Sequence, residues 1–270
     1  MEQKVSPQYV QTSLAASLTL GFQSGSFHRN AKLKGLNLLL HYEEGCSGRC
    51  HFCGLSKSRQ EGPKDKTFIR VAWPLYALEE IVERSKKKDQ IHRVCISMIT
   101  HPKALEDTLY VTQRFKEETS LFISVLITPT LIRERKPLEA MKEAGADRVG
   151  IAIDAATPEL FDQLRGRGVR GPHQWDHYWE VVRWAVEIFA KYYVGIHLIV
   201  GLGETEREMV ETIRKGHDLG ALTHLFSFFP EKGSPMEKIP LPPVDRYRRI
   251  QIARWIINEG LGTMNRMRFD

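Results

Sequence analysis

Segments that look like strands alternate with segments that look like helices along most of this 270-residue chain. Six short apolar segments have the length of buried strands, and helical patterns follow them. The predicted strands are Leu36–Tyr42, Arg93–Ile99, Leu121–Ile127, Arg148–Ile153, Tyr193–Val200 and Thr223–Phe229. Because this alternation builds a parallel sheet covered by helices, it predicts an α/β fold of six units, a partial barrel and not a closed eightfold one.

Helical patterns are predicted at Pro7–Leu20, Trp73–Lys87, Pro102–Glu118, Leu131–Ala144, Pro158–Leu164, Trp175–Ala190 and Val244–Asn258. A further helix is predicted to end at Leu219, because Thr205 and Glu208 have the spacing of a capping box at its start. We divide the chain into an N-terminal helical extension, residues 1–34, and a β/α core, residues 35–270. The C-terminal residues 266–270 look like a strand cut short.

Composition narrows the class of protein. Apolar residues make up 42% of the chain and charged residues 27%, which argues against disorder and against a membrane protein. No apolar run approaches the roughly 18 residues of a spanning helix, and polar residues at 11–13 interrupt any signal-peptide pattern, so we expect a cytoplasmic protein. The net charge of +6 suggests anionic ligands, but without a basic stripe interleaved with aromatics we expect no nucleic-acid partner and no membrane partner.

Three of the four cysteines lie within eight residues, in the loop after the first predicted strand. Cys46, Cys50 and Cys53 are separated by three and then by two residues. Three thiolates on one tight loop can bind three corners of an iron–sulfur cube, which leaves the fourth iron free to take substrate. A structural zinc site is the alternative, but it normally needs four protein ligands, and His51 would be strained between two cysteines. The fourth cysteine, Cys95, stands alone on the second predicted strand.

The pattern Cys46-x3-Cys50-x2-Cys53, with Phe52 before the last cysteine, resembles the cluster motif of radical S-adenosylmethionine enzymes. The resemblance covers nearly the whole chain, because the alternation fits that family's partial (β/α)6 TIM-like barrel. It implies a 4Fe–4S cluster whose open iron chelates the amino and carboxylate groups of S-adenosylmethionine, with Phe52 next to the cofactors. One electron from an external donor would release a 5′-deoxyadenosyl radical, which abstracts hydrogen from an unactivated C–H bond.

The same resemblance implies contacts to the nucleoside part of S-adenosylmethionine. Asp154, at the end of the fourth predicted strand, looks like the acid that hydrogen-bonds the ribose hydroxyls. The alternative is that Asp154 caps the helix that follows Pro158. The segment that starts at Ile199 resembles the motif that packs on the adenine, so Ile199 and Gly201 are assigned to that contact.

Contacts to the methionine part are also implied. Arg170, in a basic glycine-spaced loop, is our first choice for the methionine carboxylate, and Arg165 is the next, since arginine binds carboxylates in a bidentate manner. A solvated basic loop is the alternative. Ser97 and Met98 stand where the family binds the methionine amino group, but the family's Gly-Gly-Glu letters are absent, so only backbone contacts are carried over.

Within the family, the chain looks most like the branch of the biotin and lipoyl synthases. Gly201–Glu204 matches the biotin synthase form of the adenine motif, although His197 stands where the family usually has glycine. Cys95 occupies a position where biotin synthase has one ligand of a second, sulfur-donating cluster. Ser124 and Gly195 stand where further cysteines would be needed, and one thiolate cannot hold that cluster. The alternative for Cys95 is a buried, inert thiol.

Three stretches, Ser17–Phe22, Tyr42–Cys46 and Thr67–Pro74, look most like one component of the two-component, or split, lipoyl synthases. This resemblance implies hydrogen abstraction from an octanoyl chain, followed by sulfur insertion. A second radical S-adenosylmethionine subunit would supply the sulfur, and a lipoyl-carrier protein or peptide would present the octanoyl-lysine. Two alternatives stay open: another single-cluster radical enzyme that rearranges a substrate or forms a carbon–carbon bond, and a non-catalytic iron–sulfur or zinc-binding module.

Overall fold

A single mixed sheet forms the centre of the molecule. The computed structural model describes residues 3–60 and 71–269, in which eight strands are ordered β3-β1-β2-β4-β5-β6-β7-β8. The strands are β1 (Tyr9–Thr12), β2 (Gly35–Leu40), β3 (Leu75–Ala77), β4 (Arg93–Ser97), β5 (Phe122–Ile127), β6 (Arg148–Asp154), β7 (Val194–Val200) and β8 (Leu222–Ser227). All pairs from β2 to β8 are parallel, which confirms the six predicted strands and the α/β fold.

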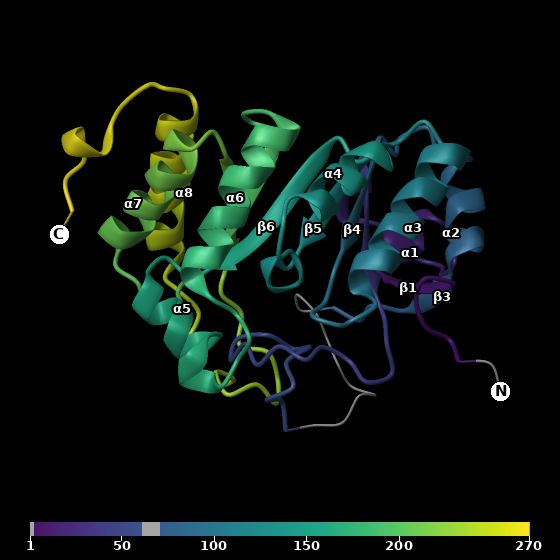
Figure 1. Ribbon diagram of the computed structural model, residues 1–270, viewed down its shortest axis with the longest axis horizontal. Coiled ribbons are helices and arrows are strands. Elements are labelled where there is room, and N and C mark those ends of the chain that lie inside the picture. The colour runs from purple at the N-terminus through teal and green to yellow at the C-terminus, as the bar shows by residue number, and fades with distance from the viewer. Residues whose placement is uncertain (1–2, 61–70, 270) are drawn as a thin grey trace.

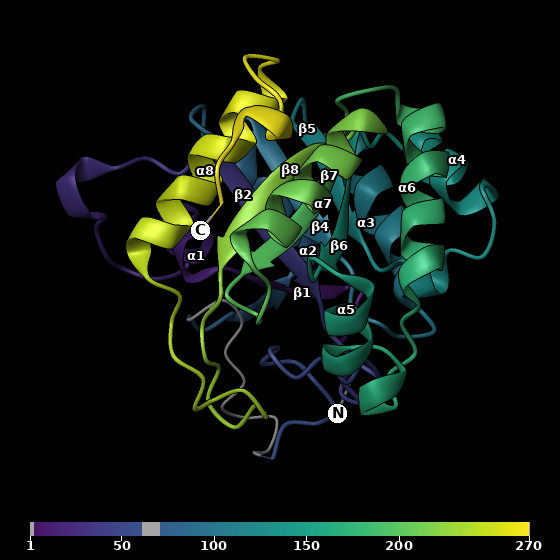
Figure 2. The ribbon, with the colours of Figure 1, turned by 90° about the vertical axis from the view of Figure 1, so that its left-hand side faces the viewer.

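Helices cover one face of this sheet (Figure 1). They are α1 (Leu14–Thr19), α2 (Leu78–Ser85), α3 (Ala104–Glu118), α4 (Lys136–Glu143), α5 (Pro158–Leu164), α6 (Trp175–Phe189), α7 (Glu206–Asp218) and α8 (Val244–Asn258), with 3-10 turns at His28–Asn30, Pro129–Leu131, Arg167–Val169 and Met264–Arg266. The Thr205–Glu208 capping box forms as predicted. Figure 2 shows α7 and α8 side by side against β8, the last strand of the sheet. Among the described residues no ladder joins β3 to β8, so the barrel stays open.

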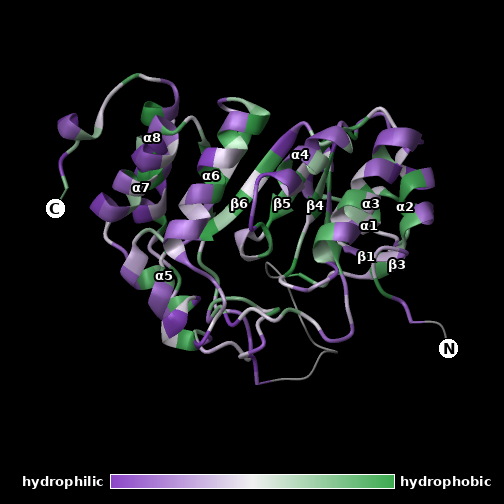
Figure 3. Cartoon of the chain, viewed as in Figure 1, coloured by the Kyte–Doolittle hydropathy of each residue, from purple (hydrophilic) through white to green (hydrophobic). Residues whose placement is uncertain are grey.

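The hydrophobic core lies between the sheet and the outer helices. Side chains alternate along each strand, so that Val149, Ile151 and Ile153 of β6 are buried against helices, while Gly150 and Ala152 belong to the other face. Figure 3 shows the same division, with hydrophobic colours on the strands and hydrophilic colours on the outward sides of the helices. The second face of the parallel strands is therefore free to carry polar residues.

The structure corrects two helix predictions at the edge of the sheet. Within the predicted helix Pro7–Leu20, residues Tyr9–Thr12 form β1 instead, which pairs antiparallel with β2 and β3. The predicted helix Trp73–Lys87 likewise begins with β3, and only Leu78–Ser85 is helical. The physical reason is that the outer edge of β2 has backbone donors and acceptors that need partners, and β1 provides them. The segment 1–34 is thus not purely helical.

Smaller corrections concern the ends of elements. The helix predicted from Leu131 begins only at Lys136, after a 3-10 turn, and the C-terminal segment forms a 3-10 turn at Met264–Arg266 and no strand within residues 264–269. Part of the stretch Thr67–Pro74, namely 67–70, lies outside the described residues, as does residue 270. No helix in the described ranges is both long and apolar enough to cross a membrane.

Candidate active site

The carboxyl ends of the parallel strands carry the residues singled out in the sequence. The cysteine loop follows β2, Ser97 ends β4, Asp154 ends β6, and the turn at Gly201 follows β7. Parallel strands end at one edge of the sheet, so these segments meet there. Figure 1 shows the loops gathered below the strands, with α5 beside the blue-violet cysteine loop.

The three cysteine thiols share one loop and interact with one another. Cys46 Sγ accepts the Gly48 N–H at 3.3 Å, and Cys53 Sγ accepts the Leu55 N–H at 3.4 Å. Burial is the largest cause that raises the pKa of Cys50 to about 11, and the charge of Cys46 adds to it. Burial and the charges of the other two cysteines also raise the pKa of Cys53. A bound cation would remove this repulsion between thiolates.

Neighbouring elements hold the cysteine loop in place. Ser47 donates both its backbone N–H and its hydroxyl to the Thr100 carbonyl, each at 2.8 Å. The His51 N–H donates to the carbonyl of Leu164, the last residue of α5, at 2.8 Å. The Phe52 side chain is buried in the core. The loop is therefore anchored after β4 and on α5.

This donor set fits a 4Fe–4S cluster better than a single ion. No group of three or more His, Cys, Asp or Glu side chains in the described ranges is arranged to hold one metal ion. Zinc needs four ligands, each within about 2.0–2.3 Å of the metal. A cube places its cysteine ligands on separate iron corners, so three thiols of one loop can bind it without converging on one point. Cys46, Cys50 and Cys53 would hold three of those corners.

Arg165 fixes the end of β6. Its Nη1 donates to Asp154 Oδ2 at 2.5 Å and to the carbonyls of Ala152 and Ile153 at 2.5 and 3.0 Å, while Nη2 donates to the Tyr178 hydroxyl at 3.2 Å. Asp154 has a left-handed backbone, with φ 66°, beside an irregularity in the β6–β7 ladder. Burial raises the pKa of Asp154, and the Arg165 guanidinium opposes that shift.

The two arginines of the basic loop lie in different places. Arg165 is only 4% exposed, and its positive charge lowers the pKa of the Cys50 thiol against the effect of burial. Arg170 is exposed, in a left-handed conformation after the 3-10 turn. The structure thus brings Arg165 and Asp154 to the cysteine loop and leaves Arg170 at the surface. The alternative that Asp154 caps α5 is wrong, because the Thr157 side chain is the cap.

A buried carboxylate shapes the turn after β7. Glu204 accepts the backbone N–H groups of Gly201 and Leu202 at 2.8 and 2.9 Å, and Arg246 of α8 pairs with it at 3.0 Å. Arg246 also donates to the Glu204 carbonyl. Gly201 has φ 105°, and a Cβ there would lie 2.9 Å from Pro242, so this position needs glycine. Gly201 is one of the residues assigned from the sequence, whereas the Glu204–Arg246 ion pair gives no local sequence signal because it joins residues 42 positions apart.

Other assigned residues lie close to this edge. Ile199 shares the inner face of β7 with His197 and is partly exposed. Ser97 and Met98 are buried at the end of β4, where the Met98 N–H already donates to the Leu126 carbonyl at 2.9 Å. The remaining cysteine, on β4, has its pKa raised to about 11 by burial, which keeps it a neutral thiol and agrees with the inert alternative.

Two histidines, which lie far apart in the sequence, stand together on the inner face of the sheet. The rings of His197 and His224 are 5.4 Å apart, in an edge-to-face arrangement. They occupy space that two glycines leave open: a Cβ on Gly150 would lie 3.3 Å from His197, and one on Gly195 would lie 2.8 Å from His224. Burial lowers the pKa of His197 to about 3, so its imidazole is neutral at neutral pH.

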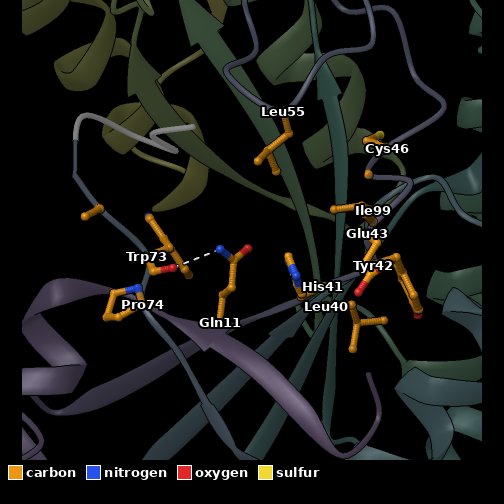
Figure 4. A pocket seen from close by; sticks show the side chains of 12 residues that line it. Gln11, Leu40, His41, Tyr42, Glu43, Cys46, Leu55, Trp73, Pro74 and Ile99 are labelled. Carbon is orange, nitrogen blue, oxygen red and sulfur yellow. Dashed lines mark hydrogen bonds between the residues drawn. The ribbon is translucent and has the colours of Figure 1, made fainter. Parts of the chain in front are cut away.

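A cavity of about 440 Å³ opens beside Cys46 (Figure 4). Gln11 spans one side of it and donates to the Trp73 carbonyl at 2.9 Å, while His41 and Glu43 add further polar groups. Its apolar lining consists of Leu40, Leu55, Ala72, Trp73, Pro74 and Ile99. This space has polar and apolar groups in its lining and can hold a small molecule next to the cysteine loop.

Residues 42–216 match the family model of the Radical SAM superfamily, and the chain belongs to this superfamily of enzymes. A relative is the GTP 3',8-cyclase of Microcystis aeruginosa (strain NIES-843 / IAM M-2473), 30% identical over 124 residues, which are 46% of this chain and 32% of that protein. The chain therefore spans about a third of that relative's length. Membership in the superfamily implies S-adenosylmethionine and a 4Fe–4S cluster.

Solved structures show the same fold at low identity. Methylornithine synthase (PylB) has a TM-score of 0.60 and 18% identity, over 89% of this chain and 67% of that one. The [FeFe]-hydrogenase maturase HydG has a TM-score of 0.64 and 15% identity, over 82% of this chain and 49% of that one. These similarities confirm the partial barrel and, at such identity, say nothing of the substrate.

Proposed function

We propose that this enzyme abstracts hydrogen from an octanoyl chain on a carrier protein, for sulfur insertion in the synthesis of the lipoyl cofactor. The observation that carries the proposal is the cavity beside Cys46, because its apolar side chains, among them Leu40, Leu55 and Ile99, could pack against a hydrocarbon chain. When bound, the 4Fe–4S cluster and S-adenosylmethionine supply the one-electron cleavage that generates the abstracting radical. The resemblance to the split lipoyl synthases points to the same substrate.

The chain's own residues would bind and orient the two cofactors. Cys46, Cys50 and Cys53 would ligate the cluster on a loop that is anchored to its neighbours. Arg165 donates to Oδ2 of Asp154, and Oδ1 has no hydrogen-bond partner among the described residues. Oδ1 can therefore accept a hydrogen bond from the ribose. The turn at Gly201, held by Glu204, would lie against the adenine.

The proposal requires partners. The sequence has four cysteines, and the three of the loop leave Cys95 as the one thiol for any second cluster. A second radical S-adenosylmethionine subunit would therefore supply the sulfur, and a lipoyl-carrier protein or octanoyl-lysine peptide would supply the acyl chain. An external donor would supply the electron.

A labelled substrate tests the proposal. The anaerobically reconstituted chain, with its partner, a reductant and S-adenosylmethionine, would receive an octanoyl-lysine peptide deuterated along the acyl chain. We expect deuterium in the 5′-deoxyadenosine and a peptide mass raised by sulfur. A Cys50→Ala variant is the control that should give neither. Unlabelled 5′-deoxyadenosine with an unchanged peptide would contradict the octanoyl substrate.

A specific observation favours a second candidate, a single-cluster enzyme that forms a bond in a polar substrate. The inner wall near His197 and His224 is polar, and burial, together with Arg254 and Arg148, lowers the pKa of His224. The positive charges of Arg148 and Arg254 near this wall suit an anionic ligand, and the curated relative is a GTP 3',8-cyclase. The same assay with GTP in place of the peptide would test it, with a cyclised nucleotide product as the supporting result.

A further inference from the structure

His173 is a buried histidine that faces the cysteine loop. Along the chain it lies between the 3-10 turn at Arg167–Val169 and α6, and it is 2% exposed. A Cβ built on Gly48 would lie 3.1 Å from His173 Nε2 and 3.2 Å from Cys46 Sγ. Both atoms therefore border the same small space above Gly48, which glycine leaves open. Within residues 3–60 and 71–269, Nε2 makes no hydrogen bond.

The hydrogen bonds of the other ring nitrogen determine where the proton of this imidazole lies. His173 Nδ1 is 2.6 Å from Thr130 Oγ1 and 2.8 Å from the Tyr178 hydroxyl. Arg165 donates to the same Tyr178 oxygen at 3.2 Å, so the proton of Tyr178 must point elsewhere. Of the acceptors near the Tyr178 hydroxyl, His173 Nδ1 is the nearest, at 2.8 Å, compared with 3.3 Å for Thr128 Oγ1 and 3.4 Å for Thr130 Oγ1. This network favours the tautomer in which Nδ1 accepts from the Tyr178 hydroxyl and the neutral ring carries its proton on Nε2.

We propose that His173 donates a hydrogen bond from Nε2–H to a sulfur of the cluster, on the side held by Cys46. Hydrogen bonds to the sulfurs help set the reduction potential of an iron–sulfur cluster. A donor stabilises the more negative, reduced state, so His173 raises the potential and eases the delivery of the electron. It is a positioning residue and no ligand, and the hydroxyls of Thr130 and Tyr178 keep its ring aimed at the loop.

The midpoint potential of the reconstituted cluster tests this proposal. In His173→Phe the donor is lost, and we expect the equilibrium constant for one-electron reduction to fall about tenfold, which is about 59 mV toward more negative potential. His173→Gln keeps an N–H donor and should restore most of the shift. His177→Phe is the matched control, because His177 Nε2 contacts the Pro129 carbonyl instead, and its potential should equal that of the wild type.

A second measurement needs neither the cluster nor a variant. Long-range ¹H–¹⁵N spectra of the wild-type apoprotein distinguish the two tautomers of His173, and we expect the Nε2–H form. The Nδ1–H form would overturn the proposal. So would a His173→Phe protein whose potential is unchanged while its affinity for S-adenosylmethionine falls, since the donor would then serve that molecule. If His173→Phe does not load a cluster, the tautomer and the Gln variant decide.

Discussion

Arg165 and Asp154 form a buried ion pair at 2.5 Å that ties the end of β6 to the loop after α5. Nη1 of the same arginine also bonds to the carbonyls of Ala152 and Ile153, so one guanidinium fixes both the backbone and the side chain at this strand end. The carboxylate assigned to the ribose is therefore positioned by a residue of the basic loop. Its place in the site depends on a neighbour that is itself almost fully buried.

Removal of this arginine should destabilise the protein strongly. We expect Arg165→Ala to lower the free energy of unfolding by about 3–5 kcal/mol, because it leaves the Asp154 carboxylate buried without a partner. Arg170→Ala, at an exposed position of the same loop, should change it by no more than about 0.5 kcal/mol. Urea denaturation of both variants measures the difference. Equal losses would show that the buried pair has no special role.

The cysteines should divide into three that hold the cluster and one that does not. Cys50→Ala should lose the iron bound after anaerobic reconstitution, together with cleavage of S-adenosylmethionine, because two thiolates do not hold the cube. Cys95→Ala makes the same substitution at a neutral thiol on β4 and should retain both. Iron analysis and detection of 5′-deoxyadenosine are the measurements. Loss of iron in the Cys95 variant would assign that thiol to a cluster.

The turn after β7 should depend on Glu204. We expect Glu204→Ala to cost about 3 kcal/mol of unfolding free energy, since Arg246 and two backbone N–H groups lose a buried acceptor. Glu208→Ala removes a half-buried carboxylate from the capping box, four residues further along the chain, and should cost about 1 kcal/mol. Urea denaturation compares the two, and a larger loss at Glu208 would contradict this assignment.

The neutral state of His197 should make stability depend on pH. Its pKa is about 3 in the folded protein against 6.5 for a free histidine, so between these values the unfolded chain binds more protons and stability falls as the pH drops. The ring is partly exposed, so we expect a loss of about 1 kcal/mol from pH 7 to pH 5.5. His197→Gln should lack this part of the loss when urea denaturation is repeated at both pH values. Identical slopes would contradict a neutral His197.

The sequence by itself determined the six parallel strands and the cysteine loop. Apolar runs bounded by turns and the spacing of cysteines are local signals, and local order follows from them. Two helices, Pro158–Leu164 and Val244–Asn258, have the predicted bounds at both ends. The cysteine motif also indicated the superfamily, because three thiols at this spacing restrict the possible chemistry more than the overall amino-acid composition does.

The tertiary structure decided what depends on partners distant in the chain. Tyr9–Thr12 became a strand because the edge of β2 offered a ladder, which outweighed a helical pattern. Arg165 is buried in the site and Arg170 is exposed, although both follow α5 within six residues. The difference arises because Asp154 and Tyr178 offer hydrogen-bond partners to Arg165. The Glu204–Arg246 pair and the aim of His173 at the cysteine loop likewise arise from packing between separate elements. Local sequence patterns record intrinsic preference, whereas these contacts exist only after the sheet has assembled.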